Sequence, residues 1–156
     1  MKNSFALSMV LITGLLLSCA SGSAHGESSQ RRPAYDTVAR GSYSGVLTQR
    51  EVIVESEAAL DRLWREIHSG RSPVPETPDI EFETMQIAAV FAGEKPSGGY
   101  SIEVTAMQHE DEHLTIYYQE QSPAPGDIVT QALTQPYHIV QFTRTELDVR
   151  FRSHTR

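Results

Sequence analysis

Residues 85–104, MQIAAVFAGEKPSGGYSIEV, are the most informative stretch of the sequence. Its first part, 85–92, is almost continuously apolar, which is typical of a central strand buried on both faces. The next part, 93–100, contains three glycines and a proline, residues that permit or impose special backbone angles. From residue 100 to residue 106 apolar and polar residues alternate, as in a strand with one face in water. The stretch therefore predicts a strand, a shaped loop and a second strand.

Upstream of this stretch, residues 57–67 predict one amphipathic helix. Ser56 stands at the N-cap position, and Gly70 follows the end of the pattern. Four apolar residues with the spacing i, i+3, i+4 and i+7 form one stripe: Leu60, Leu63, Trp64 and Ile67. Trp64 is the only tryptophan of the chain, and on this stripe we expect it to anchor the core.

Further short apolar segments predict the remaining strands. These are residues 43–47 paired with 49–54, then 114–119, 137–142 and 147–151. One helix against six or seven short strands predicts an α+β domain, in which the helix packs on a bent, mostly antiparallel sheet. His109 and His113 frame three acidic residues between two predicted strands, and we interpret this segment as a polar hairpin tip rather than a metal site.

The N-terminus is typical of an exported bacterial protein. Lys2 precedes an uncharged, mostly apolar run over 5–17, which is too short to cross a bilayer but suits a signal peptide. The run ends in Leu-Leu-Ser-Cys19, which resembles a lipobox, a signal that is cut before the cysteine and lipidated on its thiol. We expect a signal peptide over 1–18, a lipidated Cys19 with a flexible tether over 19–39, and a domain over 40–156. An ordinary signal peptide cut near Ala24 is the alternative.

The lipid on Cys19 would place the protein in the cell envelope, at the outer membrane facing the periplasm if the source is Gram-negative. The chain has 13 Lys and Arg against 20 Asp and Glu, a net charge of -7, which argues against a nucleic-acid partner. Its single cysteine excludes an intrachain disulfide or a cysteine-based zinc finger.

Catalytic and cofactor motifs are absent from the sequence. It contains no Walker loop, no dinucleotide fingerprint and no H-E-x-x-H, so we expect no cofactor and no metal. Ser97 lies near Lys95, but the G-x-S-x-G pattern of a nucleophile elbow is missing. We therefore expect a protein that is not an enzyme.

The segment 89–104 resembles the core motif of the protease complex subunit PrcB C-terminal domain family. That motif is an apolar strand, then G-x-K/R-P-T/S-G-G-Y, then an alternating strand, and Ser97 stands where threonine is commoner. Residues 121–126, residues 129–140 and the upstream helix also fit, so the resemblance spans 56–142. It implies an envelope protein linked to an exported protease, where the namesake assists assembly or stability. It does not imply enzymatic activity.

The glycine loop, residues 93–100, and the start of a later strand are the predicted interaction surface. Its residues are Lys95, Pro96, Ser97, Gly98, Gly99, Tyr100, Pro136 and Tyr137. The alternative is purely structural, with the glycines serving the turn, Pro136 the entry to a strand and Tyr137 the core.

A second likeness gives an alternative function. The run Pro96–Tyr100 is similar to the P-T-T-G-[YF] loop of chagasin-type cysteine-protease inhibitors, which present three loops at one end of a β-sandwich. Ile102 stands where that inhibitor loop is followed by tryptophan, and the present chain also has a helix. The sequence thus leaves three hypotheses: a protease-complex subunit, a protease inhibitor, and an enzyme.

Overall fold

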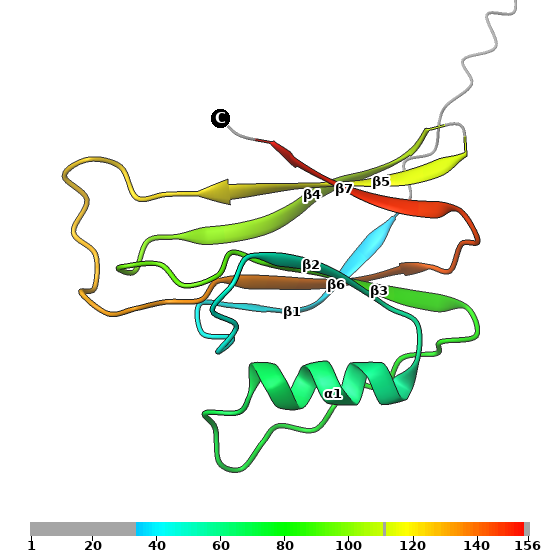
Figure 1. Ribbon diagram of the computed structural model, residues 1–156, viewed down its shortest axis with the longest axis horizontal. Coiled ribbons are helices and arrows are strands. Elements are labelled where there is room, and N and C mark those ends of the chain that lie inside the picture. The colour runs from blue at the N-terminus through cyan, green and yellow to red at the C-terminus, as the bar shows by residue number, and fades with distance from the viewer. Residues whose placement is uncertain (1–33, 111, 155–156) are drawn as a thin grey trace, which may run out of the picture.

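The computed structural model describes residues 34–110 and 112–154, which fold into three layers (Figure 1). The middle layer is a four-stranded antiparallel sheet with the order β1 (Tyr35–Gly41), β6 (Tyr137–Thr143), β3 (Met85–Phe91) and β2 (Arg50–Val54). The helix α1 (Glu57–Ile67) covers one face of this sheet. The other face is covered by a three-stranded sheet of β4 (Ser101–Glu110), β5 (His113–Gln121) and β7 (Asp148–His154), in which β5 and β7 are parallel. The α+β class is confirmed.

The strand β3 explains why there are three layers. Ile87, Ala89 and Phe91 belong to the core on the helix side, and Ala88 and Val90 belong to the core between the sheets. All five are fully buried. Since burial of a large apolar side chain stabilises by about 1.5–3 kcal/mol, both faces of this strand need a cover. The single bent sheet that we expected is instead two sheets stacked on each other.

The helix has the bounds expected from its pattern. Its apolar stripe is buried, and Trp64 is 7% exposed, with its indole N–H donating to the Pro75 carbonyl at 3.0 Å. The carbonyl of Ser56 accepts the N–H groups of Ala59 and Leu60, although the Ser56 side chain makes no capping hydrogen bond. Trp64 is therefore the core anchor that the sequence indicates.

Two expectations about the first strands are wrong. Residues 43–47 form no strand, and β2 pairs with β3 instead. The boundary between tether and domain at residues 39 and 40 is also wrong, because residues 35–39 belong to β1. This strand has few large apolar residues and depends on its pairing with β6. Its register shifts between Thr37 and Ala39, so that Tyr35 packs on the core between the sheets and Ala39 on the core beside the helix.

Polar side chains connect the two sheets at both margins. At one margin, His138 of β6 is 1% exposed and its Nδ1 accepts the N–H of Val104 on β4 at 3.0 Å. The Tyr35 hydroxyl donates to the Val104 carbonyl at 3.0 Å. At the other margin, the Tyr118 hydroxyl donates to Glu51, and burial together with this carboxylate raises the pKa of Tyr118 to about 12.

The contacts of His138 require a neutral imidazole. Because Nδ1 accepts a backbone N–H, the ring hydrogen is on Nε2, which lies 2.9 Å from the Thr37 hydroxyl oxygen. Burial lowers the pKa of His138, the positive charge of Arg40 lowers it further, and the negative charge of Glu103 opposes both. Protonation would break the hydrogen bond to Val104 that joins β6 to β4.

Stability should therefore fall on acidification. The unfolded imidazole takes up its proton near its ordinary pKa of about 6.5, and the folded one only at lower pH. The contribution of His138 is complete above about pH 6.5 and is lost as the pH falls from there through the folded pKa. Urea unfolding between about pH 8 and about pH 5 measures the loss. His138→Gln, which keeps an acceptor but does not titrate, should lose less stability, and equal losses would contradict the assignment.

Candidate functional site

Three loops meet at one end of the molecule, on the left in Figure 1. They are residues 42–49 between β1 and β2, 92–100 between β3 and β4, and 122–136 between β5 and β6. Backbone hydrogen bonds join them: Glu94 N–H donates to the Leu47 carbonyl at 3.0 Å, and Gln135 N–H donates to the Ser42 carbonyl at 2.7 Å. We call this surface the three-loop end.

The third loop holds the glycine loop through two threonines. Thr134 and Lys95 exchange both backbone hydrogen bonds, at 2.8 and 3.1 Å, and the Thr134 hydroxyl donates to the Ser97 carbonyl at 2.7 Å. The Thr130 carbonyl accepts the N–H of Gly98 at 2.8 Å. Sequence reasoning missed both threonines as site residues. Thr134 could have been found from its place just before the Gln-Pro-Tyr run that opens β6.

Close packing explains two glycines of the predicted interaction surface. Gly99 has φ +84°, and a Cβ there would lie 2.8 Å from Val129 Cγ1 and 2.9 Å from Pro123 Cβ. A Cβ on Gly98 would lie 2.3 Å from the Thr130 hydroxyl oxygen. The absence of side chains at these two glycines therefore lets the glycine loop pack closely against the third loop. This is the structural role given as the alternative in the sequence analysis.

The polar groups of the loop have separate partners. The ammonium of Lys95 pairs with Glu120 on β5 and lies 5.8 Å from the centre of the Tyr100 ring. The Ser97 hydroxyl donates to the carbonyl of Gly98 at 3.0 Å. Lys95 thus ties the glycine loop to the second sheet, and Pro96 between the two is exposed.

Pro136 and Tyr137 lie inside the fold. The Pro136 carbonyl accepts the N–H of Ala92 at 2.9 Å, which joins the start of β6 to the end of β3. Tyr137 is 6% exposed and its ring is stacked on Phe91 at 6.3 Å between centroids. Burial raises the pKa of its hydroxyl. The eight predicted residues are therefore brought to one end of the molecule, but Tyr137 faces the core there and offers little surface to a partner.

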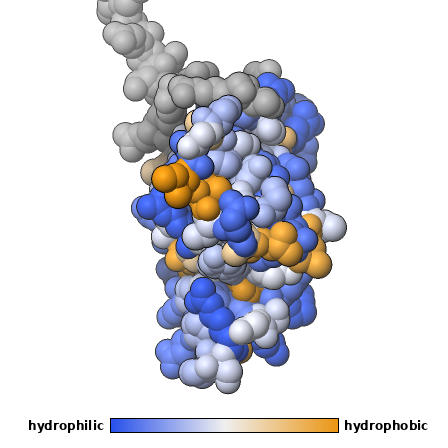
Figure 2. Space-filling view, turned by 90° about the vertical axis from the view of Figure 1, so that its left-hand side faces the viewer, coloured by the Kyte–Doolittle hydropathy of each residue, from blue (hydrophilic) through white to orange (hydrophobic). Residues whose placement is uncertain are grey.

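Exposed apolar side chains gather on the three-loop end instead. Among the described residues five large apolar side chains are exposed, and four of them lie in the first and third loops: Tyr43, Leu47, Ile128 and Leu133. Figure 2 shows this end, with apolar patches separated by polar side chains. The fifth residue, Val74, lies between α1 and β3. Sequence reasoning missed this group, although Ile128 and Leu133 stand out in a loop rich in polar residues.

Within residues 34–110 and 112–154, no group of three or more His, Cys, Asp or Glu is arranged to hold a metal ion. His113 lies 3.3 Å from Glu110, beside the hairpin tip. No helix in this part of the chain is long and apolar enough to cross a membrane. Cys19 and the expected signal peptide over 1–18 lie outside the described residues.

Comparison with known proteins gives a family match for the central part of the chain. Residues 87–143 match the family described as PrcB C-terminal. This confirms the resemblance seen in the sequence. The matched segment runs from β3 to β6 and includes the glycine loop with the third loop that holds it. No curated protein and no solved structure gives a match.

The packing of the glycine loop can be measured with a matched pair of variants. Gly99→Ala should destabilise the fold by about 2–4 kcal/mol, because it adds a clash to the strain of a left-handed residue. Gly126→Ala has the same kind of strain at φ +96° but open space around its Cβ, and should lose only about 1–2 kcal/mol. Urea unfolding of both gives the difference, and equal losses would show that contact with Pro123 and Val129 contributes nothing.

Proposed function

We propose that this protein is a non-catalytic cell-envelope lipoprotein whose domain binds another protein through the three-loop end. The partner is an exported protease or its complex, which the domain helps to assemble or stabilise. The observation that supports this most is the gathering of Tyr43, Leu47, Ile128 and Leu133 around the glycine loop. Exposed apolar side chains grouped on one surface are typical of interaction sites.

The structure around these residues suits a binding surface. Hydrogen bonds tie the three loops together, so little backbone freedom remains to be lost when a partner binds. The family match covers the second and third of these loops, and its name is the link to a protease complex. The absence of catalytic motifs in the sequence favours a binding role over an enzymatic one.

Attachment to the membrane is a separate part of the proposal and rests on the lipobox-like sequence before Cys19. Multiple acyl chains on this cysteine would hold the protein stably at the envelope, where a single chain gives only marginal binding. In a Gram-negative source, the lipid would sit in the outer membrane with the domain facing the periplasm.

Mass spectrometry of the membrane-extracted protein tests the anchor. We expect an N-terminus at Cys19 that carries diacylglyceryl and acyl groups. Cys19→Ala should move the protein from the membrane fraction to the soluble fraction. An unmodified Cys19, or an N-terminus near Ala24, would contradict the lipoprotein assignment.

Affinity capture tests the binding role. Tagged protein extracted gently from its own host should retain an envelope protease, identified by its peptidase activity and by mass spectrometry. Leu47→Asp and Leu133→Asp should each weaken this retention about tenfold, because central apolar contacts contribute about 1–2 kcal/mol or more at interfaces. Both positions are more than half exposed, so stability should stay within about 0.5 kcal/mol.

Val74→Asp is the matched control, because Val74 is also exposed but lies outside the three loops, and it should leave retention unchanged. Equal loss in all three variants, or no protease retained, would contradict the proposal. The activity of the captured protease, compared with that of the free protease, separates the two candidate roles. Unchanged or higher activity in the complex indicates an assembly subunit. Lower activity that returns with Leu133→Asp indicates an inhibitor, and the three loops at one end of stacked sheets are the specific support for that role.

A further inference from the structure

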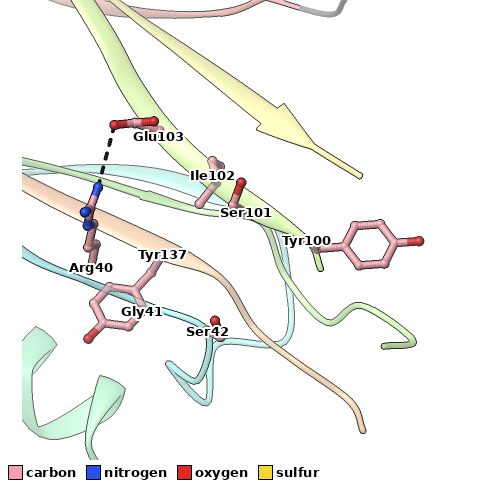
Figure 3. A pocket seen from close by; sticks show the side chains of 8 residues that line it. All are labelled: Arg40, Gly41, Ser42, Tyr100, Ser101, Ile102, Glu103 and Tyr137. Carbon is pink, nitrogen blue, oxygen red and sulfur yellow. Dashed lines mark ion pairs between the residues drawn. The ribbon is translucent and has the colours of Figure 1, made fainter. Parts of the chain in front are cut away.

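A groove lies between the edge strands of the two sheets. β1 is an edge of the four-stranded sheet and β4 is an edge of the three-stranded sheet. Where β1 ends and β4 begins, they line an open pocket of about 410 Å³ beside the three-loop end. Figure 3 shows the residues that line it: Arg40, Gly41, Ser42, Tyr100, Ser101, Ile102, Glu103 and Tyr137.

The backbone of Ile102 faces this groove. Along an antiparallel pair, residues alternate between directing their N–H and C=O towards the partner strand and directing them away from it. If one residue directs both groups away, so does the residue two positions before it. Val104 directs both groups away from β5, since its N–H binds His138 and its C=O binds Tyr35. The register with β5 is regular from Ile102 to Val104. Ile102 therefore also directs its N–H and C=O away from β5, and no described backbone group outside this strand pair forms a hydrogen bond with them.

The groove is closed at one end and open at the other. At Val104 the side chains of Tyr35 and His138 occupy the strand edge, so a ligand cannot continue along β4 past this point. Towards Tyr100 and Ser42 the edge is free and joins the three-loop end. The groove is thus shaped for a short extended segment that would enter from the loops.

The charges at the groove balance each other. Arg40 on β1 and Glu103 on β4 face one another across it, with 3.8 Å between Nη1 and Oε1 (Figure 3). Their side chains are 71% and 52% exposed, so this pair stabilises little and can open. One positive and one negative group offer no net attraction to a charged ligand, whereas unpaired backbone groups attract another backbone.

We propose that this groove binds an uncharged, extended peptide segment, which adds a short strand to the free edge of β4 at residues 101–103. The segment accepts from the N–H of Ile102 and donates to its C=O, and its side chains lie between Arg40 and Glu103. Only the origin of the segment rests on the proposed function, in which the bound protease supplies it. The hydrogen bonds to Ile102 require an extended backbone but no particular side chains. The site is therefore selective for conformation and for absence of charge, and not for a particular sequence.

The test uses synthetic peptides and the purified protein, without the protease. The probe is the capped pentapeptide acetyl-Thr-Val-Thr-Val-Thr-amide, added during nuclear magnetic resonance of the amide groups. The Ile102 amide should show the largest shift change and slower hydrogen exchange, and 0.5 M NaCl should leave the affinity within about twofold because the ligand is neutral. The same peptide with its alternate amides N-methylated should bind at least about tenfold more weakly.

A pair of tryptophan variants locates the site. Ser42→Trp fills the groove and should weaken binding about tenfold. Ser153→Trp is the control. Ser153 lies on β7 at the opposite margin, where it lines a cavity of about 690 Å³ with Gln49 and Gln119, and the substitution should leave binding unchanged. Shifts confined to residues other than 40–42 and 100–103, equal binding of the N-methylated peptide, or binding only of charged peptides would overturn the proposal. Failure of these peptides alongside normal protease capture would reject the groove and leave the three-loop end in place.

Discussion

The fold depends on one strand that must be covered on both sides. β3 is apolar on each face, and its neighbour β6 shares that character with Ile139 towards the helix and Val140 towards the second sheet. A helix alone can cover only one face, so the chain after the glycine loop turns back as β4 and β5 over the other. This turn places the glycine loop at an end of the molecule, and the loops before and after it must meet there because β2 and β6 both pair with β3.

The parts of the fold that depend on the spacing of neighbouring residues could be predicted from the sequence. The helix bounds and the burial of β3 follow from residue spacing alone, and the structure confirms both. The pairing of strands was harder to predict, because it depends on hydrogen bonds between distant segments. Residues 35–39 have a polar composition, yet they form a strand by pairing with β6. Thr134 is a similar case, since its role comes from contact with Lys95, a residue 39 positions earlier in the printed sequence.

The sequence indicated the loop around which the candidate site is built, but not the exposed side chains beside it. The glycine loop does lie at a surface, yet much of its unusual composition serves its own packing, with Gly98 and Gly99 against the third loop. The apolar side chains that a partner would meet come from the flanking loops, where no periodic pattern marks them. In the proposed interaction, the motif would supply the frame and the less regular residues of the flanking loops would supply contact area. Sequence motifs detect the frame more readily, because its backbone angles restrict residue types.

The composition of the glycine loop has one chemical consequence. Lys95 is one of only two lysines in the sequence, and the other, Lys2, lies in the expected signal peptide. In a chain processed at Cys19, Lys95 would therefore carry the sole ε-amine, held between Glu120 and Tyr100 at the three-loop end. Reagents that acylate amines would then mark a single side chain on this domain. A partner seated on the loops would shield that amine, so occupancy of the surface could be read from one labelled position.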